Sequence, residues 1–300
     1  MDLDPTQPAM PTPSSLRAHH QFWPRRLPHA ITPPATSLWD NLETSARRYP
    51  HKAALVFFGR VISYAQLLQK AERLAACLQG LGVNSGDRVV LNMQNCPQLV
   101  IAHFAILRAN AVVVPVNPMN RTEELKHYIT DPDARVAITT ADLAAELAGA
   151  SNALAPPLRL AHLLVSHFTD AFDADVSGED APPAAWTDWL LTRHPAPVLV
   201  DGQVHDWVGA LANELPLGPL TVGPTDLAVL PYTSGTTANA GVHHADHAGD
   251  VKHRHHRQDH VFCRPIAPQG AGDRVVHDAG VGVHAALGQA RGAAGVGQDG

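Results

Sequence analysis

The sequence has few cysteines, no positively charged amino terminus and no long hydrophobic run. Its three cysteines, Cys77, Cys96 and Cys263, lie far apart, which excludes a disulfide framework and a paired zinc-binding spacing. Such sparse cysteine is typical of the reducing cytoplasm. Residues 1–4 carry two aspartates where a secretory signal carries positive charge. No apolar run reaches the ~18 residues of a membrane-spanning helix, so no transmembrane segment is expected.

A field of positive charge is also missing. The formal net charge is -6 and the pI is about 6.3, which argues against binding to nucleic acid or to an anionic membrane. A small-molecule substrate is therefore the better hypothesis. Hydrophobic residues make up 45% of the chain and charged residues 17%, a composition typical of a folded globular protein.

Residues 37–140 alternate between helix patterns and continuously apolar runs. Ser63 with Gln66 three residues later forms a capping box, and the apolar positions that follow it share one helical face. Further helices are predicted at 97–108 and 141–148, together with a short helix that Asn120 caps. Asn110 is expected to end the helix 97–108 in the left-handed conformation. Apolar strands are predicted at 87–93, 111–116 and 135–140, which together indicate an α/β fold with a largely parallel sheet covered by helices.

Between residues 150 and 225 prolines interrupt the pattern. A strand is predicted at 161–165, and Trp186 and Trp189 are expected on a short helix that packs against the domain. Residues 226–232 predict another buried strand, which leads directly into a turn of hydroxyl residues and one glycine: Thr233, Ser234, Gly235, Thr236 and Thr237.

This turn has the composition of a phosphate-binding loop. Gly235 lets the backbone approach a ligand closely, successive N–H groups can surround an anion, and each hydroxyl can donate to a phosphate oxygen. An ordinary surface turn has the same composition, so the residue types alone leave both interpretations open.

The six residues 232–237, Tyr-Thr-Ser-Gly-Thr-Thr, match the start of the signature loop of the acyl-CoA synthetase, luciferase and peptide-synthetase adenylation superfamily. Segments 37–42, 47–50, 62–67, 86–89 and 109–118 also resemble these enzymes. Within the superfamily the chain looks most like bacterial medium- or long-chain fatty-acyl-CoA synthetases. The resemblance implies an incomplete, amino-terminal part of the large domain of the adenylate-forming fold.

The same resemblance implies an AMP-forming ligase. Such an enzyme joins a carboxylic acid to ATP to form an acyl-adenylate and pyrophosphate, and then transfers the acyl group to the thiol of CoA with release of AMP. Residues 233–237 would hold the β- and γ-phosphates, with Mg²⁺ bridging their oxygens. The family continues Gly-x-Pro-Lys-Gly-Val, whereas residues 238–242 here are Ala-Asn-Ala-Gly-Val. Because this lysine and all downstream family motifs are missing, no catalytic residue is assigned and the chain itself is expected to be inactive.

Three regions are therefore predicted: an irregular leader (1–36), the amino-terminal part of an AMP-binding domain (37–237) and a low-complexity tail (238–300). The tail holds nine of the 19 histidines and only one leucine, too few large apolar residues to offset chain entropy. This restricted alphabet suggests a frameshift after Thr237, and a natural low-complexity tail is the alternative. A non-catalytic nucleotide- or acyl-binding module and a non-functional truncated product remain the alternative functions.

Three single features invite sharper hypotheses. His243 and His247 have i, i+4 spacing, but no predicted helix or nearby cysteine or glutamate completes a metal site, so none is expected. Cys77 lies beside the apolar stripe of its helix and is expected to be a small core residue. His103 lies among apolar residues and is expected to be a core or edge histidine rather than a base.

Overall fold

The computed structural model describes residues 22–28, 34–172 and 176–232. The chain divides into two units, residues 1–36 and 37–300. In the first unit a short turn is described, in which the Leu27 N–H donates to the Pro24 carbonyl (3.0 Å) and the Trp23 indole donates to Pro28 (3.1 Å). All helices and strands described below belong to the second unit.

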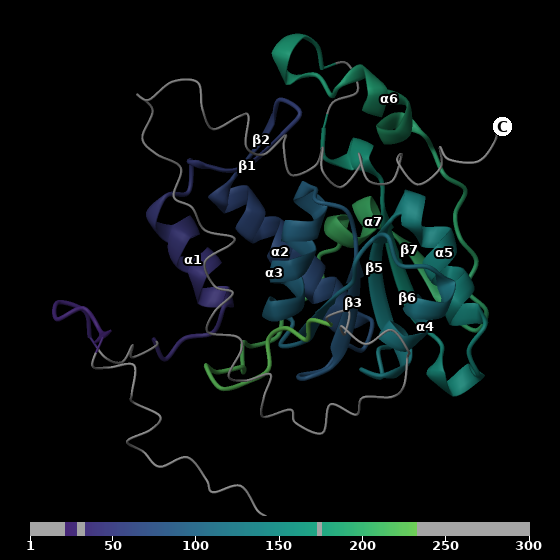
Figure 1. Cartoon of the computed structure of the whole chain (residues 1–300), viewed down its shortest axis with the longest axis horizontal. Coiled ribbons are helices and arrows are strands. Elements are labelled where there is room, and N and C mark those ends of the chain that lie inside the picture. Colours follow the sequence, from purple (N-terminus) through teal and green to yellow (C-terminus); the bar gives the residue numbers. More distant parts are fainter. Residues whose placement is uncertain (1–21, 29–33, 173–175, 233–300) are drawn as a thin grey trace, which may run out of the picture. The chain divides into compact units, whose positions relative to one another are not determined.

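A five-stranded parallel sheet forms the centre of the second unit (Figure 1). Its strand order is β4-β3-β5-β6-β7, and each neighbouring pair is parallel. The strands are β3 (Arg88–Asn92), β4 (Val112–Pro115), β5 (Val136–Thr140), β6 (His162–Ser166) and β7 (Gln203–Asp206). The sheet confirms the predicted α/β fold and the strands predicted at 87–93, 111–116, 135–140 and 161–165. These strands could be predicted because a strand that is buried on both faces carries a run of apolar residues.

Helices cover both faces of this sheet, as Figure 1 shows for α2 and α3 on one side and α4 and α5 on the other. Alternate strand residues enter different cores: Val89 and Leu91 pack with one helix layer and Val90 with the other. The first layer comprises α1 (Trp39–Arg48), α2 (Tyr64–Gly80), α3 (Pro97–Arg108) and α7 (Trp207–Ala212). The second comprises α4 (Thr122–Thr130) and α5 (Ala141–Asn152).

Helix α2 begins with the predicted capping box. The Gln66 N–H donates to Ser63 Oγ (3.3 Å), and the Ser63 N–H donates to Gln66 Oε1 (2.9 Å). The predicted apolar face is confirmed: Leu74 and Leu78 are completely buried, and Leu68 is partly buried against the same core. Burial of this face, rather than helix propensity, accounts for most of the stability of such a helix.

The short helix α4 begins one residue later than the sequence predicts. Its N-cap is Arg121, whose N–H donates to Glu124 Oε2 (2.9 Å), whereas the Asn120 N–H donates to the Asn117 carbonyl in a turn. The prediction that Asn120 caps this helix was wrong, because the acidic first turn supplies the capping oxygen through Glu124.

Among the described α-helices and strands, five have no counterpart among the predictions: α1, β1, β2, β7 and α7. Strands β1 (Ala53–Phe57) and β2 (Arg60–Ser63) form an antiparallel hairpin, whose two-residue turn has positive φ at Phe58 (43°) and Gly59 (74°). Both central residues of a type I′ turn need φ > 0, and a phenylalanine there hides the turn from sequence reading. Helix α7 was also missed, because it spans only six residues.

The proline-interrupted region contains α6 (Ala184–Leu191) and short 3₁₀ helices, η2 (Pro156–Leu158), η3 (Phe168–Asp170) and η4 (Gly178–Asp180). The predicted packing of Trp186 and Trp189 is confirmed, because both side chains pack against the first core. The ring centroid of Trp189 lies 4.6 Å from that of Phe168. Among the described residues, every helix is too short or too polar to cross a lipid bilayer.

Candidate functional site

The predicted phosphate loop, Thr233 to Thr237, lies outside the described residues, as do His243, His247 and Cys263. The segment that leads into the loop is described. The Val113 N–H donates to the Ala228 carbonyl (2.9 Å), and the Leu230 N–H donates to the Val113 carbonyl (2.8 Å). Residues 228–230 therefore run parallel to β4 at the edge of the sheet.

The predicted buried strand 226–232 is shorter and less buried than expected. Only a single bridge forms, between Val113 and Val229, and Leu227, Ala228, Val229 and Leu230 are half-buried while Asp226 is exposed. Because this segment flanks the edge strand β4, the described residues cover it incompletely.

Tyr232, the first residue of the family-like signature, is held against α4. Its hydroxyl donates to Asp131, and its ring lies 4.9 Å from that of Tyr128 and 5.5 Å from that of His127. Burial, and next the hydrogen bond and the charge of Asp131, raise the pKa of the Tyr232 hydroxyl well above its usual value of 10.0. Tyr232 thus anchors the chain immediately before the predicted loop.

Buried polar side chains collect at the carboxyl ends of the strands. Asn92 ends β3, Thr139 and Thr140 end β5, Ser166 ends β6, and Gln98 lies in the first turn of α3. Thr140 and Ser166 are neighbours in register. Oxygen atoms of Asn92, Gln98, Thr140 and Ser166 have no hydrogen-bond partner among the described residues.

These unpaired oxygens mark a place where a polar partner is expected. Each buried, unpaired polar group costs about 1–3 kcal/mol, and folded proteins keep few of them unless water or a ligand pairs with them. Ligands of open α/β sheets bind at the carboxyl ends of the strands. Amides and hydroxyls can hold a ligand by hydrogen bonds, but none of these four groups is a strong base, so the arrangement supports binding rather than proton transfer.

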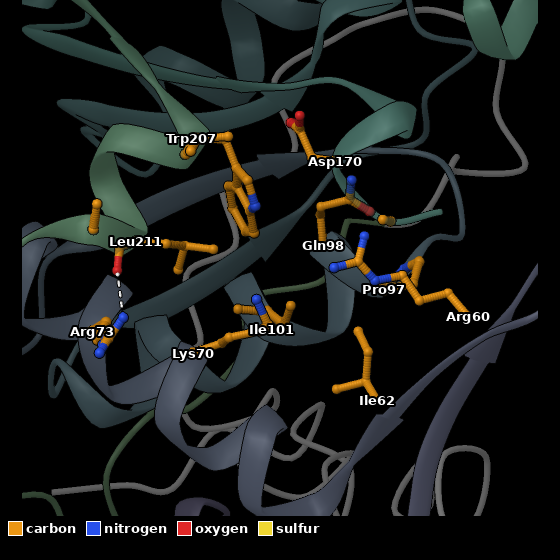
Figure 2. A pocket seen from close by; sticks show the side chains of 13 residues that line it. Arg60, Ile62, Lys70, Arg73, Pro97, Gln98, Ile101, Asp170, Trp207 and Leu211 are labelled. Atoms are coloured by element: carbon orange, nitrogen blue, oxygen red, sulfur yellow. Dashed lines mark hydrogen bonds between the residues drawn. The ribbon is translucent and has the colours of Figure 1, made fainter. Parts of the chain in front are cut away.

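A pocket of about 290 Å³ opens beside this row of polar groups. Gln98 belongs to both: its Nε2 donates to the His167 carbonyl (2.8 Å), and its side chain lines the pocket. Figure 2 shows Arg60, Lys70 and Arg73 on one side and Asp170 and Trp207 on the other. Sequence reasoning missed this pocket because its walls come from the hairpin, α2, α3, η3 and α7, and no local pattern joins them.

The cysteines and the histidine considered from sequence behave as core residues. Cys77 is half-buried against the first core, and burial raises its thiol pKa. Burial raises the pKa of Cys96 to about 12 and lowers that of His103 to about 4. A neutral thiol is a weak nucleophile, so these positions support the structural interpretation. Within the described ranges, no three histidine, cysteine or acidic residues gather as a metal site would require.

Comparison with known proteins gives a consistent result. The model of the AMP-binding enzyme family matches residues 42–248, more than half of the chain. A long-chain-fatty-acid–CoA ligase of Escherichia coli is 31% identical over 222 residues, covering 73% of this chain and 38% of the relative. A salicyl-AMP ligase/salicyl-S-ArCP synthetase of Mycobacterium tuberculosis is 34% identical over 166 residues, covering 52% and 27%.

The fold also resembles a solved structure. The crystal structure of coronafacic acid ligase from Pectobacterium brasiliense matches with a TM-score of 0.50 and 18% identity, over 66% of this chain and 33% of that one. At this identity the likeness concerns the fold alone. The chain spans less than two fifths of the length of each curated relative and of this structure.

Proposed function

We propose that this chain, which belongs to the family of AMP-binding enzymes, contributes the amino-terminal part of a ligase that activates a carboxylic acid with ATP. The acid would form an acyl-adenylate with release of pyrophosphate, and the acyl group would pass to the thiol of CoA. The observation that carries this proposal is the 31% identity with a long-chain-fatty-acid–CoA ligase over 73% of the chain. We propose a medium- or long-chain fatty acid as the substrate and the cytoplasm as the location.

Within that function, Thr233, Ser234, Gly235, Thr236 and Thr237 are the proposed contacts to the β- and γ-phosphates of MgATP. Their hydroxyls and backbone N–H groups are donors, which suits phosphate oxygens. The anchoring of Tyr232 on α4 supports this role, since it fixes the residue before the loop. Adenylate formation depends on positioning and on neutralising charge, and Mg²⁺ would contribute to both when bound with ATP.

The loop departs from the family pattern directly after Thr237. Residues 238–242, Ala-Asn-Ala-Gly-Val, lack the proline and lysine of the family's Gly-x-Pro-Lys-Gly. A missing lysine leaves phosphate charge unneutralised. We therefore propose that the 300-residue chain makes no acyl-CoA, and that a frameshift after Thr237 accounts for the departure. Reading the coding DNA in all three frames beyond Thr237 tests the frameshift. If none of the three frames encodes the family continuation, the frameshift is contradicted.

An assay of pyrophosphate release tests the function. The 300-residue chain and a repaired enzyme, with Gly-x-Pro-Lys-Gly and a family-like downstream chain, are each incubated with ATP, Mg²⁺, CoA and one acid. We expect release only from the repaired enzyme and only with fatty acids. Acid-dependent release by the 300-residue chain would refute its inactivity. Release with salicylate but not with fatty acids would refute the proposed acid, and no release with any acid would refute the ligase function.

The loop assignment has its own test in the repaired enzyme. Thr236→Val removes one hydrogen bond to a charged oxygen, worth roughly 1.5–3 kcal/mol, so kcat/KM for ATP should fall by about tenfold or more. Thr225→Val, at an exposed threonine before the segment that bridges to β4, is the matched control and should change little. Equal kinetics in the two variants would show that Thr236 does not bind phosphate.

A further inference from the structure

Three positive charges share one side of the pocket beside the carboxyl ends of the strands. Arg60 comes from β2, and Lys70 and Arg73 come from α2 (Figure 2). Burial, followed by the charges of Arg60 and Arg73, lowers the pKa of Lys70, so each arginine opposes the positive charge of Lys70. Among the described residues, no carboxylate lies within ion-pair distance of Lys70 or Arg73. An anion in the pocket would relieve this repulsion.

The other side of the pocket presents hydrogen-bond acceptors. Asp170 Oδ2 accepts from the His167 N–H (2.8 Å), and an ionised carboxylate has lone pairs for further donors. Neighbouring Gln98 is 1% exposed, and its Oε1 has no partner among the described residues. The oxygens of Asp170 and Gln98 would repel a simple anion. A ligand that carries hydroxyl groups on the side away from its negative charge could instead donate hydrogen bonds to these oxygens.

We propose that this pocket binds a small phosphorylated compound that also carries hydroxyl groups, as a sugar phosphate does. The phosphate would lie against Lys70, which Figure 2 shows between Arg60 and Arg73, and the hydroxyls would point toward Asp170. A dianionic phosphate with several acceptor oxygens matches three cationic donors better than a single carboxylate does. The volume of about 290 Å³ is near the lower limit for small-molecule sites, which fits a compound of this size. None of the residues proposed to hold MgATP takes part, so this site can fail independently of the ligase function.

Calorimetric titration of ribose 5-phosphate into the 300-residue chain tests the charged side. We expect saturable binding that weakens with added salt. Lys70→Met keeps most of the side-chain volume and removes the charge, so the affinity should fall by about tenfold or more. The matched control is Lys126→Met on α4, where the lysine pairs with Glu123 (2.7 Å) away from the pocket. Arg60→Gln, at an exposed position, provides a second variant if Lys70→Met does not fold.

Comparison of probes tests the hydroxyl-bearing side. Ribose 5-phosphate should bind more tightly than inorganic phosphate, malonate or ribose, and Asp170→Asn should weaken ribose 5-phosphate but not inorganic phosphate. The proposal is overturned by absence of saturable binding or by equal effects of Lys70→Met and Lys126→Met. If inorganic phosphate bound as tightly as ribose 5-phosphate, the proposed hydroxyl groups of the ligand would be wrong. If malonate bound as tightly, the proposed preference for phosphate would be wrong.

Discussion

At the scale of single residues, Asn110 connects three parts of the chain. It has φ of 64°, the left-handed conformation that the sequence predicts for the end of α3. Its Nδ2 donates to the Pro219 carbonyl (2.9 Å), and its Oδ1 accepts from the Thr221 N–H (2.8 Å). Its own carbonyl accepts from the Gly86 N–H (2.8 Å). One buried asparagine therefore ends a helix and holds the segment that leads toward residues 228–230.

Replacement of Asn110 should separate these two roles. Asn110→Ala loses all three hydrogen bonds of the side chain, to Pro219, Thr221 and Val222, and adds the strain of a left-handed alanine, so the free energy of unfolding should fall by about 2–4 kcal/mol. Asn110→Gly loses the same hydrogen bonds without the strain and should be the milder change by about 1 kcal/mol. Urea unfolding measures both. If the glycine variant were no more stable than the alanine variant, backbone conformation would not be part of the role of Asn110.

His103 should make stability depend on pH. Burial lowers its pKa from 6.5 to about 4 in the folded state, so between these values the unfolded chain binds more protons. The free energy of unfolding should therefore fall as the pH is lowered from 6.5 toward 4, by at most about 1.4 kcal/mol for each pH unit. Urea unfolding at pH 7 and pH 5 should show a smaller loss for His103→Gln than for the unchanged chain. Equal losses would show that His103 does not titrate abnormally.

At the scale of elements, helix α2 and the β1–β2 hairpin should respond differently to loss of an apolar side chain. Leu74 is 0% exposed in the core between α2 and the sheet, whereas Val56 on β1 is 62% exposed. Leu74→Ala should cost about 2–5 kcal/mol through lost burial and a cavity. Val56→Ala should change stability by no more than about 0.5 kcal/mol. Urea unfolding compares the two, and similar losses would contradict the assignment of α2 to the core.

The elements that sequence predicted correctly have local causes. Helix α2 carries a capping box and an apolar stripe, and β3 and β5 each contain a run of three consecutive apolar residues. The bridge at Val229 could not be distinguished from a full strand, because its length depends on which neighbours cover the edge of β4. The pocket was equally out of reach: Lys70 and Asp170 are 100 positions apart in the sequence, and only the tertiary fold brings them together.

At the scale of the whole molecule, buried polar side chains are concentrated at the carboxyl ends of the strands. The middle residues of β3, β5 and β6 are apolar, and these strands end in Asn92, Thr140 and Ser166. The cationic pocket opens beside those ends. The signature residues that predicted a nucleotide site, 233–237, follow a segment on the β4 edge. Family membership could therefore be predicted from a short loop. The polar groups at the carboxyl ends of the strands could not, because only the arrangement of several strands brings them together.

Residues 238–300 should contribute little to the stability of the folded unit. Among the described residues, both hydrophobic cores are built from residues between Leu38 and Tyr232, and residues 238–300 include one leucine and no methionine, tryptophan or tyrosine. A segment of this composition has little apolar surface to bury. A chain that ends at Thr237 should therefore unfold in urea at the same midpoint and with the same slope as the 300-residue chain, because the slope scales with the surface exposed on unfolding. A lower midpoint together with a smaller slope would show that residues 238–300 pack into the folded unit and would contradict their assignment as a low-complexity tail.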